Sequence, residues 1–213
     1  MNKTIFSLIT LLFSMSISAA TFNFAGYADS NLKDDNNTSF SEGVFTSSTE
    51  DGITLNVSGT SFYNNTWNNA FGYLDAGHAG LGLCKTRNCA GKTDDNVNDG
   101  EKLVLDFGQV VTLGETTFKN KDHGANFGGN IELSVDGVFA STLNLNLANI
   151  LDLSAFTGQV FEFYNLIADK GTDDFYINTM NVSAVPIPAA AFLFAPALIG
   201  FMGLRRKTNV SAA

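Results

Sequence analysis

Short runs in which apolar and polar residues alternate strictly are the feature that most constrains the fold of this chain. Ile53, Leu55 and Val57 alternate with Thr54 and Asn56. The same two-residue period returns at residues 103–107, 131–135, 161–163 and 175–177. Such a run is typical of a strand with one buried and one solvent-exposed face, as in antiparallel sheets.

Turn signals stand between these runs. Asp136-Gly137 separates two apolar residues and predicts a two-residue hairpin, because both positions of such a turn need positive φ. Asp51-Gly52 and Asp99-Gly100 each precede another run. We therefore predict an all-β domain at residues 21–184, a jelly-roll-like antiparallel β-sandwich, with an up-and-down barrel as the alternative. Residues 147–156 are the one stretch of this region in which we expect a short helical turn.

The N-terminal residues 1–20 have the pattern of a secretory signal peptide. Lys3 supplies the basic start, Ile5–Ile17 the apolar stretch, and Ser18-Ala19-Ala20 the small residues before cleavage. The apolar stretch is short for a bilayer span. We expect an exported chain that begins near Thr21; a buried N-terminal helix is the alternative.

The C-terminal residues 185–207 form a second hydrophobic segment. Pro186 and Pro188 precede a nearly uncharged run that ends at Leu204, and a basic cluster follows it. The run is long enough for a transmembrane helix, and the basic cluster would stay on the cytoplasmic side with residues 208–213 as a cytoplasmic tail. Pro196 weakens such a helix as a permanent anchor.

This C-terminal pattern resembles the sorting signal of PEP-CTERM proteins, in its Val-Pro-Leu-Pro-Ala variant. The residues that carry the resemblance are Val185, Pro186, Pro188, Ala189, Phe192, Phe194, Gly203, Leu204, Arg205 and Arg206. Ile187 departs from the name-giving motif, which has Glu there. The resemblance implies an exosortase-type sorting protease as a partner, transient insertion in the inner membrane, and delivery to the surface or extracellular matrix of a Gram-negative bacterium. An ordinary tail anchor is the alternative.

The charge between the two ends is strongly negative. All 21 acidic residues lie between Asp29 and Asp174, with only eight of the 12 basic residues, so this region carries a net −13. Such a charge repels phosphate backbones, which argues against nucleic acid as a partner.

Cys84 and Cys89 are the only cysteines of the chain. Outside the cytosol, oxidising conditions favour a disulfide between them. Zinc is the alternative, but the nearest histidine, His78, has no recognised ligand spacing to the pair.

A polar segment ahead of the 103–107 run suggests a cation site. Its oxygen-bearing side chains are Asp94, Asp95, Asn96, Asp99 and Glu101. This composition suits calcium, the one cofactor that the sequence suggests, although the spacing is not that of an EF-hand. The alternative is a solvated turn whose side chains bond to their own backbone. Asp173-Asp174 precedes the last run and could fall near this segment in space.

Two further sets of residues are candidates for function. Trp67, Tyr63 and Tyr73 lie among Asn and Gly residues, and such aromatic side chains can stack on a polysaccharide or, alternatively, fill the ends of a sandwich. Asp122-His123 could serve as a general base or a metal ligand, but no nucleophile is identifiable, so a loop histidine bonded to backbone is the simpler interpretation.

The order of several motifs also resembles an uncharacterised ectodomain found ahead of the same sorting tail. These motifs are Gly80–Cys84, Asp94–Glu101, Leu103–Phe107 and Asp122-His123. This resemblance implies a jelly-roll-like fold and no activity. Three hypotheses follow, in this order: a structural or adhesive surface protein that is not an enzyme, a calcium-assisted carbohydrate-binding module, and a secreted hydrolase.

Overall fold

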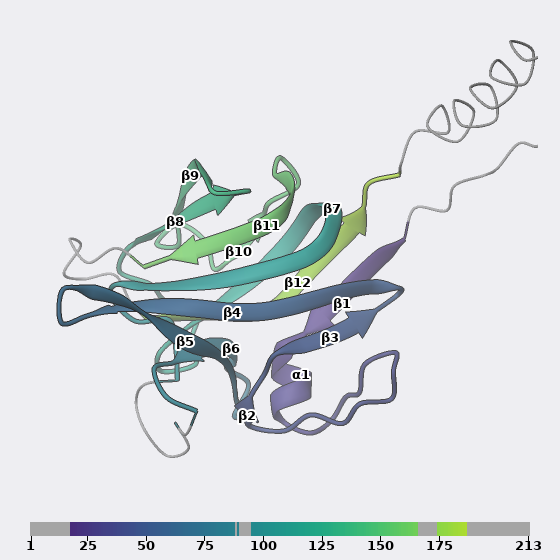
Figure 1. The fold of residues 1–213 in the computed structure, drawn as a ribbon, viewed down its shortest axis with the longest axis horizontal. Coiled ribbons are helices and arrows are strands. Elements are labelled where there is room, and N and C mark those ends of the chain that lie inside the picture. The colour runs from purple at the N-terminus through teal and green to yellow at the C-terminus, as the bar shows by residue number, and fades with distance from the viewer. Residues whose placement is uncertain (1–17, 88, 90–94, 166–173, 187–213) are drawn as a thin grey trace, which may run out of the picture. The chain divides into compact units, whose positions relative to one another are not determined.

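The computed structural model describes residues 18–87, 89, 95–165 and 174–186, and Ser18–Val185 form one compact unit. Strands dominate it, and the predicted all-β, antiparallel class is confirmed (Figure 1). The elements are β1 (Ala19–Asn23), α1 (Phe24–Ala28), β2 (Gly43–Val44), β3 (Ser47–Glu50), β4 (Ile53–Tyr63), β5 (Thr66–Asp75), β6 (Gly80–Cys84), β7 (Glu101–Asn120), β8 (Asn130–Val135), β9 (Val138–Asn144), β10 (Ile150–Asp152), β11 (Thr157–Tyr164) and β12 (Phe175–Ala184).

The five alternating runs lie within β4, β7, β8, β11 and β12, as predicted. The Asp136-Gly137 hairpin joins β8 to β9, and both of its residues have positive φ, 50° and 77°. Asp51-Gly52 makes the corresponding turn between β3 and β4. Residues 147–156 contain the short strand β10 and a turn closed by the Phe156 N–H to the Leu153 carbonyl at 2.9 Å, but no helix.

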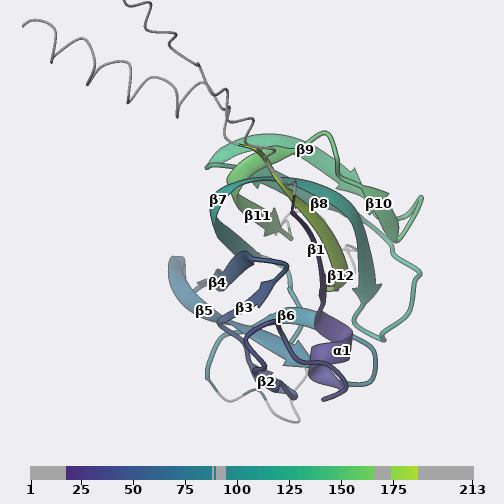
Figure 2. The ribbon, with the colours of Figure 1, turned by 90° about the vertical axis from the view of Figure 1, so that its right-hand side faces the viewer.

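The strands are joined in the order β1-β12-β6-β5-β4-β7-β11-β8-β9, all antiparallel in the pairings between neighbours. β12 also pairs with β7, so β4, β5, β6, β12 and β7 form a closed ring of hydrogen-bonded strands. β9 and β1 are the two ends of the order. The curled arrangement gives the molecule one interior face and one outer face (Figure 2).

β7 is the longest strand and contributes to two parts of the sheet. Its first half pairs with β4 on one side and β11 on the other, and its second half pairs with β12 and β10. Gly108, at φ 62°, interrupts the strict alternation of buried residues between Phe107 and Val111. The bend of β7 is clear in Figure 2. One strand thus forms part of the wall around most of the core.

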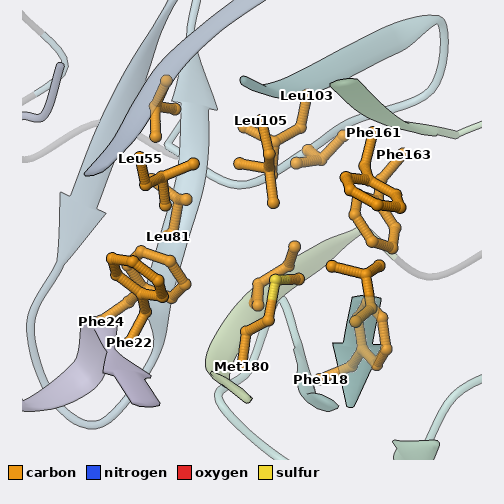
Figure 3. Close-up of a cluster of buried hydrophobic side chains, with 14 of the residues drawn as sticks. Phe22, Phe24, Leu55, Leu81, Leu103, Leu105, Phe118, Phe161, Phe163 and Met180 are labelled. Carbon is orange, nitrogen blue, oxygen red and sulfur yellow. The ribbon is translucent and has the colours of Figure 1, made fainter. Parts of the chain in front are cut away.

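The core is rich in phenylalanine and leucine from the inward faces of these strands. Figure 3 shows side chains from opposite walls meeting there. Its fully buried members include Phe22, Phe24, Leu55, Leu81, Leu103, Leu105, Phe118, Phe161, Phe163 and Met180. Truncating one such aromatic ring to alanine typically costs about 3–5 kcal/mol. The core therefore holds in place the outer-face residues described below.

β1 and β12 bring the two ends of the compact unit together. Ala19 lies opposite Ser183, and the Ala184 N–H donates a hydrogen bond of 2.8 Å to the Ser18 carbonyl. α1 follows β1 directly, with the Asn23 side chain accepting the Gly26 N–H at 2.9 Å as an N-cap. Within the described residues, no helix has the length and apolar character that a bilayer crossing needs. The predicted C-terminal helix and nearly all of the predicted signal peptide lie outside the described residues.

Candidate functional site

A cavity of about 660 Å³ collects residues from four separate parts of the chain. They come from the end of β5, the segment before β7, the loop after β7, and the start of β12. The lining side chains are Asp75, Asp95, Asn96, Asn98, Lys121, Asp122, His123, Asp174 and Tyr176. We call this cavity the acidic pocket. It unites the segment predicted to bind a cation with Asp122-His123 and Asp174.

His123 is held at the acidic pocket by both of its ring nitrogens. Nε2 lies 2.8 Å from Asp75 Oδ2, and Nδ1 lies 3.0 Å from the Gly77 carbonyl oxygen. Because a carbonyl can only accept, Nδ1 carries the hydrogen of that bond. Asp75 and Nε2 then share a second hydrogen bond. Neither ring nitrogen has a lone pair directed at a substrate, which matches the interpretation of a loop histidine bonded to backbone.

Tyr176 forms the floor of the acidic pocket. Its side chain is buried, its hydroxyl donates a hydrogen bond of 2.8 Å to Asp95 Oδ1, and its ring meets the edge of the His123 ring at 5.6 Å between centroids. Burial raises the pKa of Tyr176 most, and the hydrogen bond to Asp95 raises it further. The hydroxyl thus stays protonated and serves as a donor.

The acidic pocket has an excess of negative charge. Burial and the nearby Asp95 carboxylate raise the pKa of Asp75, although His123 and a hydrogen bond from Tyr176 act in the opposite direction. Nevertheless, no three His, Cys, Asp or Glu side chains within the described part of the chain are placed to hold a metal ion. The negative charge of the acidic pocket can therefore attract cations in general.

The structure separates the residues predicted to bind calcium. Asp95 and Asn96 line the acidic pocket, whereas Asp99 is exposed and Asp94 lies outside the described residues. Glu101 is fully buried: its carboxylate accepts the Asn98 N–H at 2.9 Å and lies 3.5 Å from the Lys85 ammonium. Glu101 thus bonds to the backbone of its own turn from a buried position.

The predicted disulfide between Cys84 and Cys89 is present, with the two Cα atoms 6.0 Å apart. Both cysteines are buried and form a small cluster with Tyr73, which is only 2% exposed. Alternation along β5 gives Tyr73 the same outward direction as Trp67. The disulfide loop covers Tyr73, however, so this predicted ligand residue packs against sulfur instead of facing solvent.

Trp67 is half-exposed, at 49%, on the outer face of the sheet. Its ring lies 5.3 Å from the Phe62 ring and 5.9 Å from the Tyr164 ring, between centroids. We call these three rings the aromatic platform. Lys102 Nζ lies 5.9 Å from the Trp67 centroid and 3.1 Å from Glu162 Oε2. The aromatic platform thus has the ion pair of Lys102 and Glu162 at its border. The two charges compensate each other, so this pair adds no net charge to the platform.

Cross-strand pairing explains why these side chains share a face. Thr60 and Tyr164 both lie opposite Lys102, from β4 and β11, and Phe62 lies opposite Trp67. Residues directly opposite in a sheet project to the same side. Tyr63 follows Phe62 by one position, so it projects to the other side, although the tip of the hairpin leaves it 61% exposed. Tyr63 is therefore separate from the aromatic platform.

Sequence reasoning missed Tyr164 and Lys102 as neighbours of Trp67. The alternation that predicted buried Phe161 and Phe163 already placed Glu162 and Tyr164 outside, but only strand order brings β11 near β5. Of the predicted sorting residues, Val185 and Pro186 are described, and Pro188, Ala189, Arg205 and Arg206 lie outside the described residues.

Comparison of the chain with protein-family models, curated proteins and solved structures finds no match.

Proposed function

We propose that this chain is an exported protein of the cell surface or extracellular matrix that adheres to polysaccharide through the aromatic platform. The observation that carries the proposal is the half-exposed Trp67, flanked by the rings of Phe62 and Tyr164 on an outer sheet face. A large aromatic ring that stays in solvent beside two others offers an apolar surface on which the flat face of a sugar ring can stack.

The polar surroundings of the aromatic platform suit sugar hydroxyl groups. Thr60 on β4 lies between Asn69 on β5 and Lys102 on β7. Ser58 and Asn56 lie further along β4 on the same face. Hydroxyl and amide groups both donate and accept hydrogen bonds, as sugar hydroxyls do. The polysaccharide class that fits is a neutral one, because Lys102 is paired with Glu162 and the chain carries a net −9.

The export route is part of the same proposal. It consists of the signal peptide at residues 1–20, the sorting segment at 185–207 with its membrane helix and the cytoplasmic tail at 208–213, processed by an exosortase-type protease in the inner membrane. The resemblance of the C-terminal motif supports this route. The antiparallel strands support the jelly-roll-like sandwich that we propose as the class of the domain at residues 21–184, and the closed ring of strands is the feature that it shares with the barrel alternative.

The test of adhesion is retention of the full-length protein, in mild non-ionic detergent, on insoluble polysaccharides. Cellulose and chitin serve as neutral probes and alginate as an anionic one. We expect retention on a neutral probe but not on alginate. Trp67→Ala should weaken retention on the neutral probe about two- to tenfold, the effect of losing one stacked aromatic ring.

Tyr63→Ala is the matched control, because Tyr63 is an exposed aromatic residue of the same hairpin that projects to the other side. The proposal requires that Tyr63→Ala leave retention unchanged. Equal retention of wild type and Trp67→Ala on every probe would refute it.

The geometry gives less support to the other two hypotheses. In the described part of the acidic pocket, neither a serine nor a cysteine lies among the lining residues, and His123 is engaged through both ring nitrogens. A hydrolase that uses His123 as a base would have to break one of these contacts first. Calcium assistance has no group of three His, Cys, Asp or Glu side chains to rest on within the described residues.

A further inference from the structure

β9 forms one end of the strand order, at the rim of the molecule (Figure 1). It pairs with β8 along its inner side. Among the described residues, no backbone hydrogen bond links Val138–Asn144 to any segment other than β8. The opposite side of β9 therefore presents backbone N–H and C=O groups that another strand can pair with.

The surface around this edge is apolar. Val138 is 69% exposed and Phe139 57%, and the segment that follows β9 exposes Leu147 and Ile150. Proteins commonly protect an edge strand with a charge, a proline, a bulge or a covering segment. β9 contains neither charge nor proline, although a bulge between Phe139 and Ser141 interrupts its pairing with β8. β1, at the other end of the order, has no large apolar side chain exposed.

Charge identifies the occupant that fits this edge. The fourteen residues from Val138 to Leu151 include no charged side chain, in a chain with a net −9. Two copies of such a chain repel each other over most of their surfaces, and the repulsion is weakest where an uncharged edge meets the same uncharged edge. A basic partner would instead be drawn toward the acidic regions.

We infer that β9 pairs antiparallel with β9 of a second copy of this chain, so that the sheets of the two molecules join across a twofold axis. Antiparallel pairing of a strand with itself is self-complementary, as an isologous contact requires. Val138 and Phe139 would add apolar burial beside the new backbone hydrogen bonds. Self-association supplies cohesion between molecules, which is separate from the adhesion to polysaccharide proposed above.

The size of the contact sets its strength. One pair of seven-residue strands with a few apolar side chains is small beside the roughly 1,600 Å² of a standard protein interface. The dimer should therefore be weak and reversible in dilute solution, and substantial only where copies are crowded together. Added salt should strengthen it, because screening reduces the repulsion between two acidic molecules.

The test is sedimentation velocity of the full-length protein in mild non-ionic detergent over a series of concentrations, at low and high NaCl. We expect a monomer–dimer equilibrium whose dimer fraction rises with protein concentration and with salt. Phe139→Lys places a charge on the edge and should raise the dissociation constant about tenfold or more.

Val110→Lys is the matched control, because Val110 is an exposed valine on β7, a strand that does not pair with β9. It should leave the dimer unchanged, and both variants should melt as the wild type does. Two outcomes would overturn the inference: a monomer at every concentration, or a dimer that Phe139→Lys does not weaken. The second outcome would place the contact elsewhere, such as in the C-terminal hydrophobic segment.

Discussion

The Tyr176 hydroxyl donates a hydrogen bond of 2.8 Å to Asp95 Oδ1, which ties the start of β12 to the segment before β7. The two residues are 81 positions apart in the chain. The backbone bond from the Val97 N–H to the Phe175 carbonyl, 2.8 Å long, runs beside it. These bonds fix one wall of the acidic pocket against its floor.

Tyr176→Phe should destabilise the protein by about 1.5–3 kcal/mol, because it removes one hydrogen bond to a charged acceptor and keeps the buried ring. For a chain of this size, we expect the melting temperature to fall by roughly 2–4 °C for each kcal/mol. Urea denaturation of both proteins measures the difference. Unchanged stability would mean that water replaces the hydroxyl at Asp95 without cost.

Asp75→Asn should change how stability depends on pH. Burial raises the pKa of Asp75 above its ordinary 3.8, so the folded protein binds this proton more tightly than the unfolded chain does. The resulting stabilisation is complete below pH 3.8 and is lost as the pH rises through the raised pKa. The asparagine stays neutral and keeps an oxygen for His123. Thermal melts from pH 3 to 7 should therefore show a flatter profile for Asp75→Asn, and parallel profiles would contradict this assignment.

Gly82→Ala should be destabilising by about 1–3 kcal/mol, the usual cost of overpacking. A Cβ at Gly82 would lie 2.1 Å from the Asp95 carbonyl oxygen and 2.7 Å from the Asn96 Cα, and both are backbone atoms that cannot rotate away. The segment 95–98 must then move away from β6. Equilibrium unfolding gives the cost, and a variant as stable as the wild type would show that this segment shifts freely.

Replacing Cys84 and Cys89 together by serine should cost about 2 kcal/mol, the chain-entropy value for so short a loop. The loop also covers Tyr73, so loss of the disulfide should increase the exposure of that ring. Thermal melting with and without a reducing agent gives the first quantity. The reducing agent should lower the melting temperature of the wild type and leave that of the serine variant unchanged. This difference would show that the loss of stability comes from the disulfide.

Calcium and magnesium at equal concentrations should raise the melting temperature by similar, small amounts relative to EDTA. Both ions screen the acidic pocket, but the described residues offer neither ion a group of three acidic, histidine or cysteine side chains. A shift with calcium alone would contradict this expectation. Asp94→Asn would then be the first variant to examine, because Asp94 belongs to the predicted cation segment.

The secondary structure of this chain was largely predictable because alternation and Asp-Gly turns are local signals. The start of β4, the Asp136-Gly137 hairpin and the runs in β11 and β12 all follow from residues close in sequence. The length of β7 and its pairing with β12 were not predictable in this way. They depend on partners such as Ser183, which is 71 positions from Thr112, its partner in β7.

The candidate sites show the same limit. Alternation gives Trp67 and Tyr73 the same outward direction, but only the folded disulfide loop reveals that Tyr73 is covered. The suggestion that Asp174 falls near the cation segment agrees with the structure, which places it in the acidic pocket with Asp95. The contact between His123 and Asp75 joins the loop after β7 to the end of β5 and has no local signal.

The pairing of β1 with β12 brings both ends of the compact unit to one end of β12. Ala19 and Ser183 mark the end where the chain enters and leaves the domain, whereas Tyr176 is at the other end of β12. A strand rises about 3.3 Å per residue, so these ends are roughly 20 Å apart. The Phe62 N–H bonds to the Gly100 carbonyl near that far end. The aromatic rings and the acidic pocket therefore lie at the end of the compact unit opposite to the end where the chain enters and leaves it.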